Sequence, residues 1–253
     1  EPIGKSVGYR VRFDDRSSNA TRLLFATPGV VLRMLRADID RWPAAVILDE
    51  FHERSLEVDL CAAILLAARR NGRTTAPLVL TSATLDGRSL SEQIGAAHIT
   101  AEGRTYPVHI THTEDISSPS AQDLEDRVGT IVRKVLRDQE GDVLVFLPGK
   151  GEIDRCRETC ARGAPRGVEI LPFHANLNSD AIDRIFQPTT NRRVFLATNV
   201  AETSLTLPGV RTVIDAGLVR QIVHRGGRSA LALMPTSEAS LDQRSGRAGR
   251  TAP

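Results

Sequence analysis

Short runs of branched aliphatic residues alternate with amphipathic stretches along most of the chain, and this alternation constrains the fold more than any other feature. A parallel strand that is buried on both faces is a nearly continuous aliphatic run, and the crossover to the next strand usually contains a helix. The pattern therefore predicts an α/β protein in which parallel sheets are flanked by helices. A chain of 253 residues is long enough for two such domains.

The alternation stops around residues 100–107 and then begins again, which predicts two α/β layers joined by a short linker. Before the break, the pattern predicts strands at Val7–Phe13, Leu23–Ala26, Ala45–Leu48 and Pro77–Leu80, and helices at Pro28–Leu35 and Leu56–Arg70. After the break, it predicts strands at Val108–Thr111, Asp142–Leu147, Val168–Leu171, Val194–Ala197 and Arg211–Ile214, and helices at Ala121–Arg137, Ile153–Ala161, Ser179–Phe186 and Thr236–Arg244. Gly226 and Gly227 lie between apolar-rich arms and predict a hairpin within residues 217–233. The two domains are thus expected at residues 1–104 and 105–253.

Five of the expected strands are followed by small or polar residues instead of further aliphatic residues. Asp49 and Glu50 follow Val46–Leu48, and the other four ends carry Thr81–Thr84, Pro148–Gly151, Ala197–Asn199 and Asp215–Gly217. In open α/β sheets, ligands bind outside the carboxyl ends of the strands. A carboxylate pair at such an end can hold a hydrated Mg²⁺ and polarise a water molecule, as in nucleoside triphosphatases. Taken alone, the pair fits a solvated Asp-Glu turn equally well.

An arginine-rich segment lies near the C-terminus, with the sequence Gln-Arg-Ser-Gly-Arg-Ala-Gly-Arg at residues 243–250. A plain surface helix would lose about 1 kcal/mol at each of Gly246 and Gly249 relative to alanine, so a simple solvated helix end is disfavoured. Small residues there let the backbone approach another group closely. Arg247 and Arg250 would then be held towards an anion, and the planar guanidinium suits a phosphate because it binds bidentately.

Composition limits the remaining classes of function. The net charge is only +2, so bulk charge does not indicate nucleic acid, and any such contact would depend on local arginines. No apolar run approaches the roughly 20 residues that span a bilayer, so no membrane partner is expected. Cys61, Cys156 and Cys160 do not form a disulfide framework, and they predict reduced structural thiols in a cytoplasmic protein.

Four motifs occur in a specific order, and together they carry a resemblance that covers nearly the whole chain. They are Asp-Glu-Phe-His at residues 49–52, Ser-Ala-Thr at 82–84, Thr-Asn-Val-Ala-Glu-Thr-Ser-Leu-Thr at 198–206 and the arginine-rich segment at 243–250. The combination resembles the DEAH-type superfamily-2 helicases. Phe51 and the Glu-Arg-Ser-Leu that follows His52 resemble the bacterial HrpB branch in particular, as does the final Gly-Arg-Thr-Ala-Pro.

The resemblance implies a fold of two tandem RecA-like domains, and it implies that ATP hydrolysis between them drives movement along or unwinding of RNA. The first domain, residues 1–104, would be truncated at its N-terminus, and the second would occupy residues 105–253. By the same resemblance, Asp49 and Glu50 would bind ATP and Mg²⁺, with Asp49 holding the metal through water and Glu50 orienting or deprotonating the attacking water. His52 would contact the arginine-rich segment.

Further roles are carried over from the family to matching positions. Gln243, Arg247 and Arg250 would reach the γ-phosphate, where an arginine finger can be worth roughly 10³–10⁵-fold in rate. Ser82 and Thr84 would couple the state of the nucleotide to the grip on the nucleic acid. The residues expected along a single-stranded RNA path are Arg12, Thr27, Gly29, Thr198 and Thr203. The hairpin within 217–233 would separate paired strands.

Gly4-Lys5-Ser6 matches the end of a phosphate loop, a motif that needs Gly-x-x-x-x-Gly-Lys-Ser/Thr between a strand and a helix. The first glycine of that motif would precede residue 1, and Val7–Phe13 alternates as a strand does. We interpret the match as a coincidence. We expect this chain to be an internal piece of a longer protein, with the phosphate loop upstream of Glu1. The 253 residues are then expected to bind ATP poorly and to be inactive by themselves.

Rival functions differ in what they require. A metalloprotease is excluded because His52-Glu53 would need a second histidine at position 56, which is Leu56. His109 and His112 fit surface positions on a strand better than a metal site, because no cysteine or carboxylate cluster accompanies them. A DNA-directed translocase shares the same motifs. A non-catalytic RNA-binding module with a decayed ATPase would be expected to lose the acid pair or the arginines first. These last two alternatives stay open.

Overall fold

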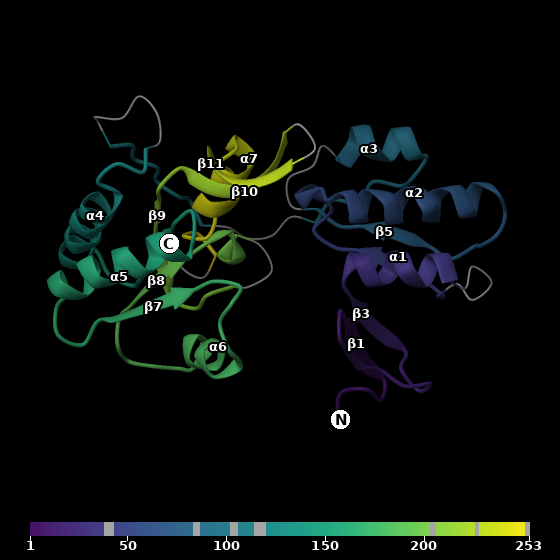
Figure 1. The fold of residues 1–253 in the computed structure, drawn as a ribbon, viewed down its shortest axis with the longest axis horizontal. Coiled ribbons are helices and arrows are strands. Elements are labelled where there is room, and N and C mark those ends of the chain that lie inside the picture. Colours follow the sequence, from purple (N-terminus) through teal and green to yellow (C-terminus); the bar gives the residue numbers. More distant parts are fainter. Residues whose placement is uncertain are drawn as a thin grey trace. The chain divides into compact units, whose positions relative to one another are not determined.

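The structure is a computed structural model, and it describes residues 1–37, 43–82, 87–101, 106–113, 120–202, 206–225 and 228–250. It divides into two compact units, Glu1–Thr100 (unit 1) and Ala101–Pro253 (unit 2) (Figure 1). Each unit has its own hydrophobic core. The assignment of residues 1–104 and 105–253 to two helicase domains stays a prediction. None of the described helices combines the length and the apolarity that a membrane crossing requires.

The described residues of unit 1 form two small sheets, three α-helices and one 3₁₀ turn. In the first sheet, β1 (Val7–Val11) pairs antiparallel with β2 (Asp14–Arg16) and parallel with β3 (Leu23–Ala26). The remaining elements are α1 (Pro28–Ala37), β4 (Val46–Leu48), the 3₁₀ turn η1 (Phe51–Glu53), α2 (Leu56–Arg70), β5 (Leu78–Leu80) and α3 (Gly87–Ile94). Strands β4 and β5 pair in parallel, so their carboxyl ends lie at the same edge.

The core of unit 1 forms where α1 and α2 pack against β4 and β5. Its buried members are Leu35, Leu48, Phe51, Cys61, Ala62 and Leu65. Helix α2 begins at a defined point, because the side chain of Ser55 accepts a hydrogen bond of 3.2 Å from the amide of Val58 and so satisfies one of the first free N–H groups. Leu48, the last residue of β4, belongs to this core, so Asp49 directly follows a packed residue.

Unit 2 is built on a four-stranded parallel sheet with the order β7-β8-β6-β9. The sheet strands are β6 (Asp142–Phe146), β7 (Glu169–Phe173), β8 (Arg193–Ala197) and β9 (Val210–Asp215). The other elements are α4 (Leu124–Asp138), α5 (Lys150–Gly163), α6 (Ser179–Phe186), η2 (Asn199–Ala201), the hairpin strands β10 (Leu218–Arg225) and β11 (Arg228–Pro235), and α7 (Glu238–Ser245).

The two central strands of unit 2 are buried on both faces, as the apolar runs Val143–Phe146 and Val194–Ala197 predict. Side chains of α4 and α5 pack with one face of β6 and β8, including Val143, Val145 and Val194. Residues of α6 and η2 pack with the opposite face, including Phe146 and Phe195. The fold class predicted from the alternation, parallel sheets flanked by helices, is confirmed (Figure 1).

Most of the predicted elements are confirmed, with their ends shifted by a few residues. The strand predicted at Val108–Thr111 is wrong, because residues 106–113 form no strand and are exposed. An alternating pattern supplies no hydrogen-bond partner by itself, and a lone strand is not stable. Strand β1 ends before Phe13, which adopts a left-handed conformation with φ 71° in the turn to β2. Strand β2 and helix α3 were not predicted.

Two further interpretations can be compared with the structure. Gly4-Lys5-Ser6 forms a turn that leads into β1 and not into a helix, which agrees with a coincidental match. All three cysteines are free and buried, as expected for structural thiols. Burial raises the pKa of Cys156 to about 12 and that of Cys160 to about 11, so both thiols are protonated and unreactive at neutral pH.

Candidate functional site

The predicted carboxylate pair lies at the carboxyl end of β4, in unit 1. The backbone braces this point, because the Thr81 amide donates to the Leu48 carbonyl (3.0 Å) and the Phe51 amide donates to the Thr81 carbonyl (2.8 Å). Glu50 has φ 50° and ψ 42°, a left-handed conformation that turns the chain sharply after the strand. Such a conformation is uncommon for a residue with a side chain, and strained residues of this kind tend to cluster at functional sites.

The side chains around the pair hold Asp49 in place. The Thr81 hydroxyl donates to Asp49 Oδ1, and the Glu50 amide donates to the same oxygen at 3.1 Å. The Glu50 side chain is 29% exposed, and its Oε2 lies 3.5 Å from Nε2 of the buried His52 side chain. Ser82 follows β5 on the surface, whereas Thr84 lies outside the described residues.

Asp49 and Glu50 suit a Mg²⁺ ion that binds together with a nucleotide. Among the described residues, no group of three or more His, Cys, Asp or Glu side chains could hold a metal ion by itself. Mg²⁺ does not need such a group, because it is usually held by one or two carboxylates together with substrate phosphates and water. Asp49 is exposed at a strand end and is oriented by two hydrogen bonds, as this kind of site requires.

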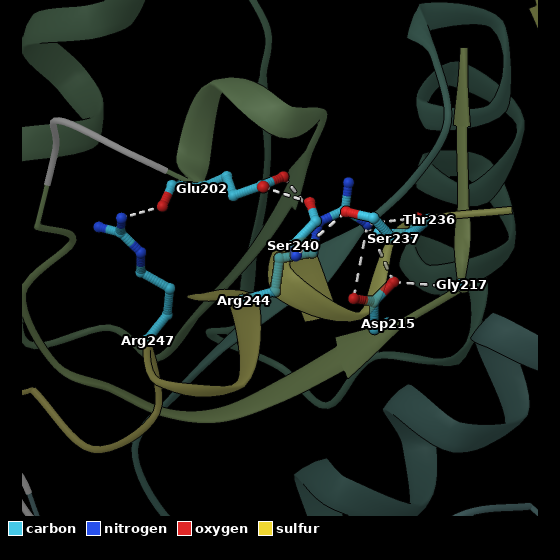
Figure 2. Close-up of polar contacts among 8 residues, drawn as sticks. All are labelled: Glu202, Asp215, Gly217, Thr236, Ser237, Ser240, Arg244 and Arg247. Carbon is cyan, nitrogen blue, oxygen red and sulfur yellow. Dashed lines mark hydrogen bonds and ion pairs between the residues drawn. The ribbon is translucent and has the colours of Figure 1, made fainter. Parts of the chain in front are cut away.

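In unit 2, the arginine-rich segment begins in the last turn of α7. The Arg244 side chain is only 2% exposed, and its guanidinium lies among side chains from three segments (Figure 2). Its Nε donates to Glu202 Oε2 at 2.9 Å, and its Nη1 donates to Asp215 Oδ1 at 3.1 Å and to Thr236 Oγ1 at 3.2 Å. Its Cζ lies 4.9 Å from the centre of the Phe146 ring. Burial raises the pKa of the Asp215 carboxyl, and the Arg244 cation opposes that shift only in part.

The other two arginines of the segment lie at one small pocket. The Arg247 side chain is buried, and its Nη2 donates to the backbone carbonyl of Glu202. Arg250 is exposed, and its Nη1 donates to Thr206 Oγ1 at 3.3 Å. The pocket is lined by Arg247, Arg250, Leu144, Ala201, Thr206, Leu207 and Val210. The predicted residue Gln243 is partly buried in α7, next to Arg244.

The expected close approach is found at Gly249. A Cβ atom there would lie 2.5 Å from the backbone oxygen of Tyr106, whose amide donates to the Gly249 carbonyl at 2.9 Å. At Gly246 the nearest atom would be 3.4 Å away, an ordinary contact. One of the two glycines is therefore required by packing, and the packing partner is the chain itself.

The residues predicted to contact nucleic acid lie in both units. In unit 1, Arg12, Thr27 and Gly29 are exposed. The Thr27 amide donates to the Arg10 carbonyl at 3.3 Å, so the start of α1 lies beside the strand that leads to Arg12. In unit 2, Thr198 follows β8, and its amide donates to the Phe173 carbonyl at 3.2 Å. Thr203 lies outside the described residues.

Comparison with known proteins identifies the family. The model of the helicase conserved C-terminal domain matches residues 126–252. The chain belongs to this helicase family. It is 39% identical, over 259 aligned residues, to the ATP-dependent RNA helicase HrpB of Escherichia coli K12, a match that covers 100% of the chain and 32% of the relative.

Two solved structures extend the helicase comparison to the whole fold. A crystal structure of the Escherichia coli DEAH/RHA helicase HrpB matches with a TM-score of 0.90 and 38% identity, covering 99% of this chain and 32% of that one. A crystal structure of the E. coli DExH-box NTPase HrpB matches with a TM-score of 0.87 and 36% identity, covering 100% of this chain and 32% of that one. The predicted resemblance and the RecA-like fold are thus confirmed, and the chain spans about a third of the length of these helicases.

The sequence did not single out Glu202, Asp215 or Arg244 as a group. The sequence marks Asp215 only as a polar residue at a strand end, and Glu202 and Arg244 lie within the motifs at residues 198–206 and 243–250. The sequence does not reveal that Arg244 is buried, because its partners Glu202 and Asp215 lie 42 and 29 residues away along the chain.

Proposed function

We propose that this chain is part of the ATP-hydrolysing region of a DEAH-type RNA helicase, which couples ATP hydrolysis to movement along, or unwinding of, RNA. The observation that carries the proposal is the placement of an oriented carboxylate pair at the end of a parallel sheet, in a chain 39% identical to an ATP-dependent RNA helicase. The residue composition of that strand end suits the hydrolysis of a phosphoanhydride bond.

The acid pair and the arginines have separate roles in this proposal. Asp49 would hold Mg²⁺ through water, and the bound ion would neutralise charge on the phosphates. Glu50 orients the attacking water and accepts its proton, and the neighbouring His52 steadies the Glu50 carboxylate. Gln243, Arg247 and Arg250 stabilise the charge on the γ-phosphate, which is the usual contribution of arginines in this chemistry. The contact of His52 with the arginine-rich segment stays a prediction.

Single-stranded RNA is the proposed partner, and the relative named above is an RNA helicase. Arg12, Thr27 and Gly29 in unit 1, with Thr198 and Thr203 in unit 2, would contact its backbone. Backbone contacts give little sequence preference and a strong dependence on salt. Stimulation of ATPase activity by RNA compared with DNA of the same sequence tests this choice. Equal or greater stimulation by DNA would favour a DNA-directed translocase.

The substitution Glu50→Gln tests the catalytic role in the natural polypeptide that carries these residues. We expect phosphate release at saturating ATP to fall by about 10²–10⁴-fold, the usual contribution of a general base. Binding of a fluorescent ATP analogue should persist, because glutamine keeps the shape of the side chain. The matched control is Glu92→Gln, an exposed glutamate of α3 in the same unit, which should hydrolyse ATP normally. Undiminished turnover by the Glu50 variant would refute the assignment.

A further inference from the structure

Arg244 is the most deeply buried charged residue among the described residues, and unlike Arg247 and Arg250 it is not among the residues that line the pocket. The carboxylates on either side of it, Glu202 and Asp215, are themselves only 12% and 18% exposed. A buried guanidinium that is satisfied by two carboxylates and a hydroxyl is not available to a ligand. Arg244 must therefore act through its neighbours if it contributes to the proposed reaction.

The backbone connects Arg244 to Arg247 directly. The Arg247 amide donates to the Arg244 carbonyl at 3.1 Å, and the Gly246 amide donates to the Asp242 carbonyl at 3.1 Å. These bonds continue the last turn of α7 as far as Arg247. The direction in which the Arg247 side chain leaves the backbone is thus determined by the position of the helix end.

Glu202 contacts the same segment twice. Its carboxylate accepts hydrogen bonds from the Arg244 guanidinium and the Ser240 hydroxyl (Figure 2). Its backbone carbonyl accepts a hydrogen bond from the Arg247 guanidinium. Glu202 thus contacts both Arg244, which holds the end of α7, and Arg247, the predicted phosphate-binding arginine. A shift of Glu202 relative to α7 would move the acceptor of Arg247 as well.

We infer that Arg244 and Glu202 are positioning residues, whose ion pair fixes the end of α7 and thereby sets where Arg247 can reach a bound phosphate. The inference rests on the proposed function, because it concerns the same arginines. It assigns no contact with the nucleotide to either residue. Lysine cannot replace Arg244 fully, since an ammonium group lacks the planar fork that satisfies Glu202 and Asp215 together.

The test uses Arg244→Lys and Glu202→Gln in the natural polypeptide, with Arg193→Lys as the matched control. Arg193 is likewise a buried arginine of unit 2, with a carboxylate partner in Asp142 at 2.9 Å and its Cζ 5.0 Å from an aromatic ring. It lies at the start of β8, and among the described residues its guanidinium donates to Asp142, Ile185, Gln187 and Pro208, none of which belongs to the arginine-rich segment. We expect all three variants to melt at lower temperature. Only the first two should lower kcat for RNA-stimulated ATP hydrolysis, by about 10–100-fold, which is the effect of a small misplacement.

A second comparison separates positioning from general loss of structure. In an Arg247→Ala background, Arg244→Lys should lower kcat no further, because the residue through which it acts is gone. An equal loss of kcat in both backgrounds, or an equal loss in the Arg193→Lys control, would overturn the inference while leaving the proposed function intact. If the unaltered protein hydrolyses no ATP, or if Arg247→Ala leaves kcat unchanged, the proposed role of the arginines fails and the inference fails with it.

Discussion

The two glycines of the arginine-rich segment have different reasons to be small. Gly249 has the backbone oxygen of Tyr106 where a side chain would begin, so any Cβ must push the two backbones apart. Gly246 has φ −61° and ψ −11°, which any residue adopts, and space for a methyl group. The backbone bond between Tyr106 and Gly249 ties the end of the segment to the beginning of unit 2.

This difference leads to a prediction at the scale of one methyl group. Gly249→Ala should lower the free energy of unfolding of unit 2 by about 1–3 kcal/mol, the usual cost of overpacking. Gly246→Ala is the control, and it should be neutral or slightly stabilising, because alanine restricts the unfolded chain more than glycine does. Urea unfolding followed by circular dichroism measures both. Equal effects of the two substitutions would contradict the packing argument.

Individual side chains were predictable from the sequence when their role depended on near neighbours. Asp49 and Glu50 were predicted because they follow an aliphatic strand directly. Arg244 was not singled out, although it has the same residue type and the same motif as Arg247. Arg244 is held by carboxylates that the fold brings close, whereas Arg247 lines a pocket, and a local pattern does not contain that information.

At the scale of elements, the hairpin β10–β11 is anchored to the helical layer of unit 2 by an ion pair. Arg220 Nη2 lies 2.8 Å from Oε1 of Glu152, a buried residue in the first turn of α5. Burial raises the pKa of Glu152, but the hydrogen bond from Arg220 and further contacts outweigh it, so the pKa lies below its ordinary value of 4.5. The charged form is therefore stabilised by folding. This stabilisation is present above the unfolded-state pKa and is lost as the pH falls through the folded-state pKa.

The substitution Arg220→Met tests the anchor. At neutral pH the variant should lose about 1–3 kcal/mol of unfolding free energy, because a buried carboxylate loses its main partner. The difference from the unaltered protein should shrink as the pH falls below about 4.5, where Glu152 becomes protonated. Arg157→Met, at an exposed position on α5, is the control and should have little effect. A difference that grows on acidification would contradict the assignment.

Elements were predictable where burial and hydrogen bonding agree with the local pattern. The central strands β6 and β8 are apolar after their first residue and pair on both sides, so their sequence reflects their position. Strand β2 has the sequence Asp-Asp-Arg and exists only because the turn at Phe13 brings it beside β1. The segment 108–111 has the opposite property, since it alternates as a strand but pairs with no strand among the described residues.

At the scale of the whole molecule, the two units have cores of different size. The described core of unit 1 is a cluster of six buried residues, whereas unit 2 has clusters of fourteen and ten on the two faces of its sheet. Hydrophobic burial is the main favourable term in folding, and small domains bury a smaller fraction of their surface. Several aliphatic and aromatic side chains of unit 1 are also exposed, among them Leu23, Phe25 and Ile47.

We therefore expect this chain to unfold in two steps, with unit 1 unfolding first. The sequence has a single tryptophan, Trp42, so combining Trp42→Phe with Phe51→Trp places one tryptophan in the buried core of unit 1, where its fluorescence reports on that unit. In urea, the fluorescence transition should precede the main loss of helical circular dichroism, to which α4, α5 and α6 of unit 2 contribute. A reporter in unit 2, made by combining Trp42→Phe with Phe186→Trp on α6, should move the fluorescence change to the later transition. Coincident transitions for both reporters would show that the chain unfolds as one cooperative body, and the inequality of the two cores would then not determine its stability.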